Sequence, residues 1–231
     1  MFERFKHRSH ELERLDTGDY TPQEYAKWQR EMKFIHRVFG DMRALKNSLF
    51  RDIQKSGSNR FSVLDVGAGS GGLMLELDKW SVDYERFLVG SEFDAAAAGA
   101  IKNNGIRSIQ CDALRLPFEG NAFDYVICSL FLHHLGDEDA VALIREMARV
   151  AARRIYIIDL NRHPMAYYLY KIFGRIFLQR FTLEDGALSI LRSRTPSELF
   201  DLSEKAELQD IKVEHSKANR LILSGSSPKP A

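Results

Sequence analysis

From Phe61 onward, short apolar runs alternate with stretches of helical periodicity, and this alternation constrains the fold more than any other feature of the chain. The runs are rich in β-branched and aromatic residues and read SVLDV, RFLVGSE, RSIQC, FDYVICSL and RRIYIIDL. Strands that alternate with helices pair in parallel through right-handed crossovers, which place helices on both faces of the sheet. Near the end, IKVEHS and RLILSG follow each other closely, as an antiparallel pair does. The sequence therefore predicts an α/β fold with a doubly wound, mostly parallel sheet and an antiparallel C-terminal strand pair.

The first sixty residues have a different pattern, with helix-capping residues and helical spacing of apolar residues, which predicts a helical cap. Thr21-Pro22-Gln23-Glu24 combines an N-cap threonine, a proline at the first helical position and a capping-box glutamate. Apolar residues then recur at spacings of three and four, as on one helix face, at Tyr25, Trp28, Met32, Ile35 and Phe39. We expect an N-terminal helical cap over 1–60, a main domain over 61–226 with a helical lid inserted at about 162–207, and a loose tail over 227–231.

Composition narrows the classes of function. A formal net charge of +1 gives no general attraction to nucleic acid or to anionic membranes. No apolar run approaches the roughly 18 residues of a membrane-spanning helix, and the charged start MFERFKHRSHELER is unlike a secretory signal. Cys111 and Cys128 stand apart, which indicates neither a disulfide framework nor a zinc site. We expect a cytoplasmic protein without stable membrane insertion.

Residues 63–72, VLDVGAGSGG, place a cluster of glycines directly after the first expected strand. The run fits G-x-G-x-x-G, the fingerprint of dinucleotide sites, from Gly67, and it fits D-x-G-x-G-x-G from Asp65. Glycines at this point allow a tight turn and let a ligand approach backbone N–H groups at the start of the next helix. This physics suits a dinucleotide and S-adenosylmethionine alike, and a lone glycine pattern does not separate them.

Acidic residues near the ends of the first three strands help to choose between these ligands. Asp65 precedes the turn, where a carboxylate suits a ligand that carries an ammonium group rather than a pyrophosphate. Glu92 ends the second strand, 25 residues after Gly67, and can accept both hydroxyls of a ribose, although a nicotinamide enzyme would have such an acid too. The third strand ends in CDA (111–113), and LPFEGNAFDYVICS follows it immediately.

Together these stretches resemble the Rossmann-like (class I) S-adenosylmethionine-dependent methyltransferases, most closely the branch that modifies small molecules. The resemblance covers about residues 61–160 and rests on D-x-G-x-G-x-G (65–71), GSE (90–92), CDA (111–113), LPF (116–118), FDYV (123–126) and LHHL (132–135). It implies S-adenosylmethionine as the cofactor, bound by Asp65, Gly67, Ala68, Gly69, Gly71, Glu92, Asp112, Ala113 and Ser129. In this family Asp65 and the glycine loop would hold the methionine portion, and Glu92, in place of the more usual aspartate, the ribose. Asp112 and the backbone of Ala113 would meet the adenine edge.

The segment after the fourth strand contains the candidate catalytic base, His133. The alternative is a histidine that is packed or hydrogen-bonded in the loop. His133 and His134 are adjacent, and adjacent residues do not easily face one site, so we expect no metal. Asp159, at the end of the fifth strand, is a further candidate.

Two other acids are expected to be structural rather than functional. Asp94 stands directly before the helical stretch AAAAGAIKNN, which is the position of an N-cap. Asp124 lies at the entrance of the fourth strand, at the opposite end from the ligand edge of such a sheet.

The stretch PMAYYLYKIFGRIFLQRF (164–181) is crowded with aromatic side chains and is interrupted by Lys171 and Arg175. Its periodicity predicts a helix with an apolar face. Three roles fit this face: packing on the domain, a lid over an apolar or aromatic acceptor, or a helix that lies on a membrane surface.

The resemblance and these features predict a methyltransferase that acts on a small acceptor, of phenolic, quinone or polyketide-like type. SLFL stands where enzymes that methylate exocyclic amines of bases carry an Asn/Asp-Pro-Pro-aromatic tetrad, so we expect no nucleic acid partner. A base is needed only if the acceptor is not already an anion. An NAD(P)-dependent oxidoreductase and a non-catalytic S-adenosylmethionine-binding protein are the alternatives.

Overall fold

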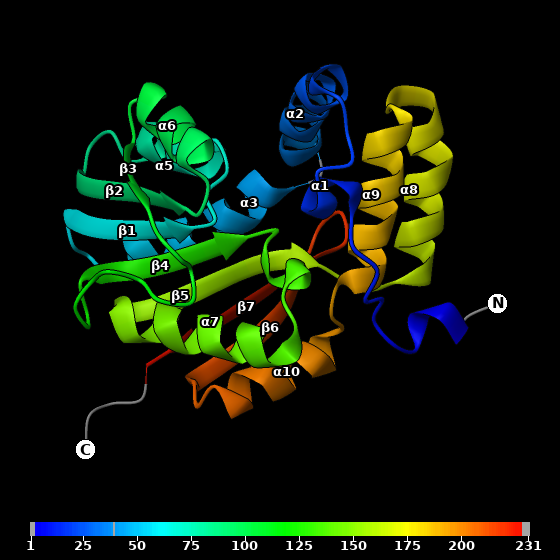
Figure 1. Cartoon of the computed structure of the whole chain (residues 1–231). Coiled ribbons are helices and arrows are strands. Elements are labelled where there is room, and N and C mark those ends of the chain that lie inside the picture. The colour runs from blue at the N-terminus through cyan, green and yellow to red at the C-terminus, as the bar shows by residue number, and fades with distance from the viewer. Residues whose placement is uncertain (1–2, 39, 228–231) are drawn as a thin grey trace.

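Seven strands form one mixed sheet in the order β3-β2-β1-β4-β5-β7-β6 (Figure 1). The computed structural model describes residues 3–38 and 40–227, so the predicted helix position Phe39 and residues 228–231 of the tail lie outside it. The strands are β1 (Arg60–Val66), β2 (Glu85–Glu92), β3 (Arg107–Gln110), β4 (Phe123–Ser129), β5 (Ala151–Leu160), β6 (Gln209–Ser216) and β7 (Arg220–Ser226). Strands β1 to β5 pair in parallel, while β7 is antiparallel to both β5 and β6. The predicted fold class is confirmed.

Two layers of helices cover the sheet, because alternate residues of each strand face opposite sides. One layer consists of α7 (Asp137–Val150) and α10 (Pro196–Lys205), which bury Leu143, Met147 and Leu199 against Val66, Val126 and Ile157. The other consists of α5 (Gly72–Trp80), α6 (Ala95–Asn103) and a helical segment made of α3 (Asp41–Leu45), the π-helical turn η2 (Lys46–Phe50) and α4 (Arg51–Lys55). Leu45, Leu49 and Met74 pack there with Val63, Ile127 and Ile158.

Residues 41–55 therefore belong to the packing of the sheet, although they precede the first strand. Leu45 and Leu49 are fully buried beneath the sheet face. The division of the chain at residue 60 stays a prediction.

A third group of helices lies beyond the carboxyl ends of the parallel strands (Figure 1). It contains η1 (Glu3–Phe5), α1 (Arg14–Thr17), α2 (Pro22–Val38), α8 (Pro164–Phe177) and α9 (Arg180–Arg192), and it faces the short 3-10 helix η3 (Leu132–His134) that follows β4. The capping box of Thr21 and Glu24 forms as predicted, since each backbone N–H bonds the other's side chain at 2.8 and 3.2 Å. In the described ranges 3–38 and 40–227, no helix combines the length and apolar character needed to cross a bilayer.

Helices α8 and α9 form a tightly interlocked antiparallel pair. Tyr170 lies over Gly186, where an added Cβ would meet the phenol oxygen at 2.1 Å, and its hydroxyl donates to the carbonyl of Thr182 at 2.8 Å. Within α8 the buried residues are Tyr167 and Gly174, while most of its apolar side chains are exposed. Packing of the apolar face on the domain, one of the three predicted roles of this segment, is therefore wrong for most of that face.

Candidate active site

The loop between β1 and α5 is shaped by glycines in the left-handed backbone region. Gly67, Gly69 and Gly71 have φ angles of +69°, +58° and +78°, which residues with a Cβ rarely adopt. The N–H groups of Gly67 and Ala68 donate to the carbonyl of Ser91 on β2 at 3.0 and 3.1 Å, which anchors the start of the loop. A Cβ on Gly69 would meet no atom within 4 Å, so the space above this residue is open to a ligand.

Two buried polar atoms at this edge of the sheet lack partners within the described part of the chain. They are Oδ1 of Asp65, near the end of β1, and Oγ of Ser129, at the end of the neighbouring strand β4. Burial, and then the charge of Glu92, raise the pKa of Asp65 well above its usual value. Buried polar groups are nearly always hydrogen-bonded, so these two atoms indicate a place for a polar ligand. A ligand ammonium group would both pair with Asp65 and lower its pKa.

The other predicted contacts lie where β2 and β3 end. Glu92 is half-buried and accepts the backbone N–H of Gly69 at 2.5 Å, which ties the second strand to the glycine loop. Burial raises the pKa of Glu92, although this hydrogen bond opposes the shift. Asp112 is exposed and accepts the N–H of Leu114 at 2.9 Å, and half-buried Ala113 lies between them. The structure thus brings Asp65, Gly69 and Glu92 together and places the CDA stretch after the adjacent strand.

The two acids expected to be structural have structural partners. Asp94 is the N-cap of α6 and accepts the N–H of Ala97 at 2.9 Å, which confirms that prediction. Asp124 accepts bonds from the N–H and hydroxyl of Ser62 at 2.8 and 2.9 Å and pairs with Arg153 at 2.9 Å. It links the starts of β1, β4 and β5, far from the ligand edge.

His133 forms a buried pair with Asp159. Its ring Nδ1 lies 2.7 Å from Oδ1 of Asp159, and its backbone N–H donates to Oδ2 at 2.9 Å. The side chains of both residues are 4% exposed. Burial opposes ionisation of Asp159, but the charge of His133 and the hydrogen bond to it outweigh that effect and lower the pKa of the acid. Because the carboxylate holds the proton on Nδ1, Nε2 is left as the atom that can accept another proton.

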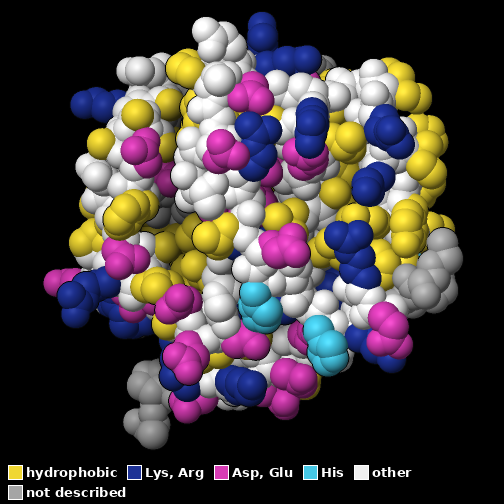
Figure 2. Space-filling view, turned by 45° about the vertical axis from the view of Figure 1, so that its right-hand side comes forward, with side chains coloured by type: hydrophobic (Ala, Val, Ile, Leu, Met, Phe, Trp, Pro, Cys, Tyr) yellow, Lys and Arg dark blue, Asp and Glu magenta, His cyan; other side chains and the backbone are white. Residues whose placement is uncertain are grey.

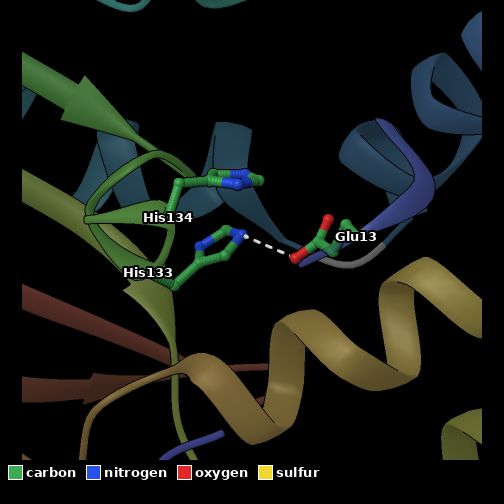
Figure 3. A group of neighbouring side chains, drawn as sticks. All are labelled: Glu13, His133 and His134. Carbon is green, nitrogen blue, oxygen red and sulfur yellow. Dashed lines mark ion pairs between the residues drawn. The ribbon is translucent and has the colours of Figure 1, made fainter. Parts of the chain in front are cut away.

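The Nε2 atom of His133 faces Glu13, a residue of the N-terminal segment (Figure 3). The distance from Nε2 to Oε1 of Glu13 is 4.0 Å, and Glu13 is buried. Ser189 Oγ and Arg192 Nη1, both on α9, hold that oxygen at 2.8 and 3.4 Å. Burial raises the pKa of Glu13 to about 7, although these neighbours favour its charged form. Sequence reasoning missed Glu13, since no pattern around it marks a site 120 residues away in the chain.

His134 shares this space, contrary to the expectation that adjacent histidines would not face one site. Its ring centroid lies 4.2 Å from that of His133, and its Nδ1 lies 3.0 Å from Oδ1 of Asp16. Glu13, His133 and His134 each present a ligand atom within 4.8 Å of the others, a donor set that suits a divalent cation. The guanidinium of Arg192, bonded to both Glu13 and Asp16, already supplies positive charge there, which favours an acid–base role. The expectation of no metal stays a prediction.

The N-terminal segment covers this cluster and is fastened to α9. The carboxylate of Asp185 accepts the backbone N–H groups of Arg14 and Leu15 at 3.0 and 2.9 Å. From the same segment, Arg8 donates to the backbone carbonyl of His133 at 2.9 Å. The N-terminal segment is therefore held by the histidine loop before Glu13 and by α9 after it.

Comparison with known proteins identifies the central part of the chain. Residues 63–154 match a family model described as a methyltransferase domain. The human protein named "Probable tRNA methyltransferase 9B" is 30% identical over 133 residues, which are 53% of this chain and 27% of that protein. A demethylmenaquinone methyltransferase of Roseiflexus castenholzii is 36% identical over 91 residues, 38% of this chain and 37% of that protein. The chain thus matches well under half of the length of these two relatives.

A solved structure extends the likeness beyond the matched domain. Magnesium protoporphyrin IX methyltransferase from Synechocystis PCC 6803, with bound S-adenosylhomocysteine, superposes with a TM-score of 0.63 at 16% identity. The match covers 90% of this chain and 95% of that one. The chain therefore carries a methyltransferase domain, and its fold is that of the class I, Rossmann-like S-adenosylmethionine-dependent methyltransferases, as the sequence predicts.

Proposed function

We propose that this chain transfers a methyl group from S-adenosylmethionine to a hydroxyl of a small acceptor, of phenolic, quinone or polyketide-like type. One observation carries the proposal: a buried carboxylate oxygen without a partner in the described residues lies at the same sheet edge as a buried His–Asp pair. Asp65 is on β1, His133 follows β4 and Asp159 is on β5, and these strands are neighbours in the sheet. A site for a cationic ligand and a base are thus adjacent.

We assign donor binding to the residues named from the resemblance. The ammonium group would pair with Asp65, and the open space over Gly69 would admit the ligand close to the loop. Glu92 would exchange its bond to Gly69 for the ribose hydroxyls, and Asp112 with Ala113 would border the adenine. Gly67, Ala68, Gly71 and Ser129 complete this set. When bound, S-adenosylmethionine supplies an electrophilic methyl group on a sulfonium.

His133 is the proposed base for the acceptor. Its Nε2 would take the proton of the acceptor hydroxyl, and Asp159 would stabilise the resulting imidazolium while it holds the ring in place. The 4.0 Å between Nε2 and Oε1 of Glu13 is too long for a hydrogen bond. One hydroxyl oxygen between them can bond to both atoms, so Glu13 is a suitable positioning residue for the acceptor.

A small acceptor is favoured over RNA by several observations. The chain has SLFL after β4 in place of an Asn/Asp-Pro-Pro-aromatic tetrad, and its net charge is only +1. The quinone named for the Roseiflexus relative is an acceptor of the proposed type. The human relative is named for tRNA, and the matched segment is 27% of its length.

The experiment compares cofactors first and acceptors second. S-adenosylhomocysteine should raise the melting temperature of the purified chain, whereas NAD and NADP should not; the reverse result would favour an oxidoreductase. A donor with a labelled methyl group is then offered with phenols, quinones, polyketide-like compounds and tRNA, with and without EDTA. We expect label in a phenolic or related acceptor and no effect of EDTA. Cofactor binding without label in any acceptor would favour a non-catalytic binding protein, and label in tRNA alone would contradict the proposed acceptor.

A further inference from the structure

Helix α8 exposes an apolar stripe along its outer side. The side chains recur at spacings of three and four, which places them on one face of the helix. Their exposed fractions are Met165 64%, Leu169 46%, Ile172 59%, Phe173 56%, Ile176 70% and Phe177 70%. Figure 2 shows hydrophobic side chains gathered on the right-hand side of the molecule, with Lys and Arg side chains beside them. Exposed apolar residues are common singly, but a continuous stripe of this kind marks an interaction surface.

The stripe is not needed to hold α8 on the molecule. The opposite side of the helix packs on α9 through Tyr167, Tyr170 and Gly174. Gly174 lies so close to Leu183 of α9 that an added Cβ would be 2.7 Å from its Cδ1. The helix is thus anchored on one side and presents the other to its surroundings.

Positive charge is concentrated on the same stretch. Lys171 and Arg175 are both exposed on α8, which contains no Asp or Glu, whereas the whole chain has a net charge of only +1. The two other arginines of residues 160–183 are neutralised, because Arg162 is buried against Glu198 and Arg180 pairs with Glu184. Within the described residues Arg175 has no acidic partner. Lys171 and Arg4 both lie over the ring of Tyr167, at 5.4 and 5.1 Å from its centroid. The surface around the stripe is therefore cationic even though the chain is nearly neutral.

We propose that α8 binds anionic lipid surfaces and lies in the plane of the bilayer interface. The apolar stripe would enter the boundary between headgroups and acyl chains, while Lys171 and Arg175 would reach the lipid phosphates. Two other occupants fit less well. A second copy of the chain, placed stripe to stripe, would bring the lysines and arginines of both copies together, which like charges oppose. Single-stranded RNA requires flat rings for stacking, but most of the stripe is aliphatic.

The test measures binding of the full chain to vesicles by flotation. Neutral phosphatidylcholine vesicles are compared with vesicles that also contain phosphatidylglycerol. We expect binding to the anionic vesicles that weakens as salt concentration rises, because surface charges are screened. Ile176→Glu with Phe177→Glu should reduce binding about tenfold or more, since it places two charges in the apolar stripe. Val82→Glu is the matched control, because Val82 is 65% exposed and precedes β2, at the amino-terminal end of the parallel strands and away from α8.

A second pair of variants tests the charge. Lys171→Glu with Arg175→Glu should reduce binding to anionic vesicles about tenfold or more. Each basic residue near an anionic membrane contributes about 1 kcal/mol of attraction, and the variant removes two of them. Lys102→Glu with Lys212→Glu changes the same number of exposed charges elsewhere and should leave binding unchanged. S-adenosylhomocysteine affinity should be equal in all four variants. Absence of wild-type binding would overturn the proposal, as would a dimer that the stripe variant dissociates, or displacement of the chain from vesicles by RNA alone.

Discussion

The two halves of the proposed site are built in different ways. The donor half, at the glycine loop and the ends of β2 and β3, is made largely of backbone and of contacts close in sequence. Its link between Gly69 and Glu92 spans 23 residues. The acceptor half is made of side chains from distant parts of the chain. Glu13 and Arg192, for example, are 179 residues apart.

The parallel sheet by itself forms the donor half, whereas segments that flank the sheet in sequence form the acceptor half. The donor half follows directly from parallel strands whose carboxyl ends meet at one edge. The acceptor half requires the N-terminal segment to contact the histidine loop through Arg8 and helix α9 through Asp185. Substitutions in the donor half should therefore act on cofactor binding alone, whereas those in the acceptor half should act on turnover and stability.

The largest effect is expected from Gly69→Val. The residue has a φ of +58° and open space above it, so a branched side chain would strain the backbone and occupy the proposed place of the donor. Calorimetry should detect no binding of S-adenosylhomocysteine. Gly57→Val is the control, because Gly57 also has a left-handed φ, of +67°, with no atom near its Cβ position. Equal affinity of the two variants for S-adenosylhomocysteine would show that the glycine loop does not bind the donor.

His133→Gln should lower the rate of methyl transfer about 10² to 10⁴-fold, the range for a general base. The affinity for S-adenosylhomocysteine should stay within about threefold, because His133 belongs to the acceptor half. The neighbouring variant His134→Gln serves as the control and should retain most activity. If both variants lose activity equally, the pair acts together rather than through His133 and Asp159.

Glu13→Gln should change how stability depends on pH. In the folded chain the pKa of Glu13 is raised to about 7 from the usual 4.5, so the folded state binds the extra proton between these values. Stability from this group is present below about pH 4.5 and is lost as the pH rises to about 7. The loss is about 3 kcal/mol.

The measurement compares wild type and Glu13→Gln by denaturant unfolding at pH 5 and pH 8. Other titrating groups, such as Asp159 with its lowered pKa, contribute to both proteins and largely cancel in the difference. The free energy of unfolding of Glu13→Gln, relative to that of wild type, should increase as the pH rises. A constant difference would mean that Glu13 is ionised throughout this range, and would weaken its proposed place beside the acceptor.

The smallest effect is expected from Glu92→Ala, which should weaken donor binding by roughly 1.5–3 kcal/mol, the range for hydrogen bonds to a charged group. Asp94→Ala is the control at a residue two positions away. It removes the cap of α6 and should lower the melting temperature while donor affinity stays unchanged. Loss of donor affinity in the Asp94 variant alone would mean that Asp94, at the helix cap, contacts the ribose in place of Glu92, at the strand end.

Much of the fold could be predicted because its signals are local. Apolar periodicity predicts the strands, and the caps at Thr21 and Asp94 form as the residue types indicate. The acceptor half could not be predicted in the same way. Nothing near Glu13 points to His133, and the facing rings of two adjacent histidines depend on the short η3 turn.

The apolar stripe of α8 shows a second limit of local signals. Periodicity correctly indicated a helix with an apolar face, but the direction of that face depends on which side α9 occupies. The interlock of Tyr170 with Gly186 decides this, and no pattern in the sequence couples those two positions.

That contact between Tyr170 and Gly186 also packs α8 and α9 closely together. The Tyr170 ring of α8 fills the space over Gly186 of α9, where any larger residue would collide with it. Since α9 also holds the N-terminal segment through Asp185 and Arg192, a continuous chain of contacts leads from α8 to Glu13. The exposed face of α8 and the buried His133 are thus connected through α9 and Glu13.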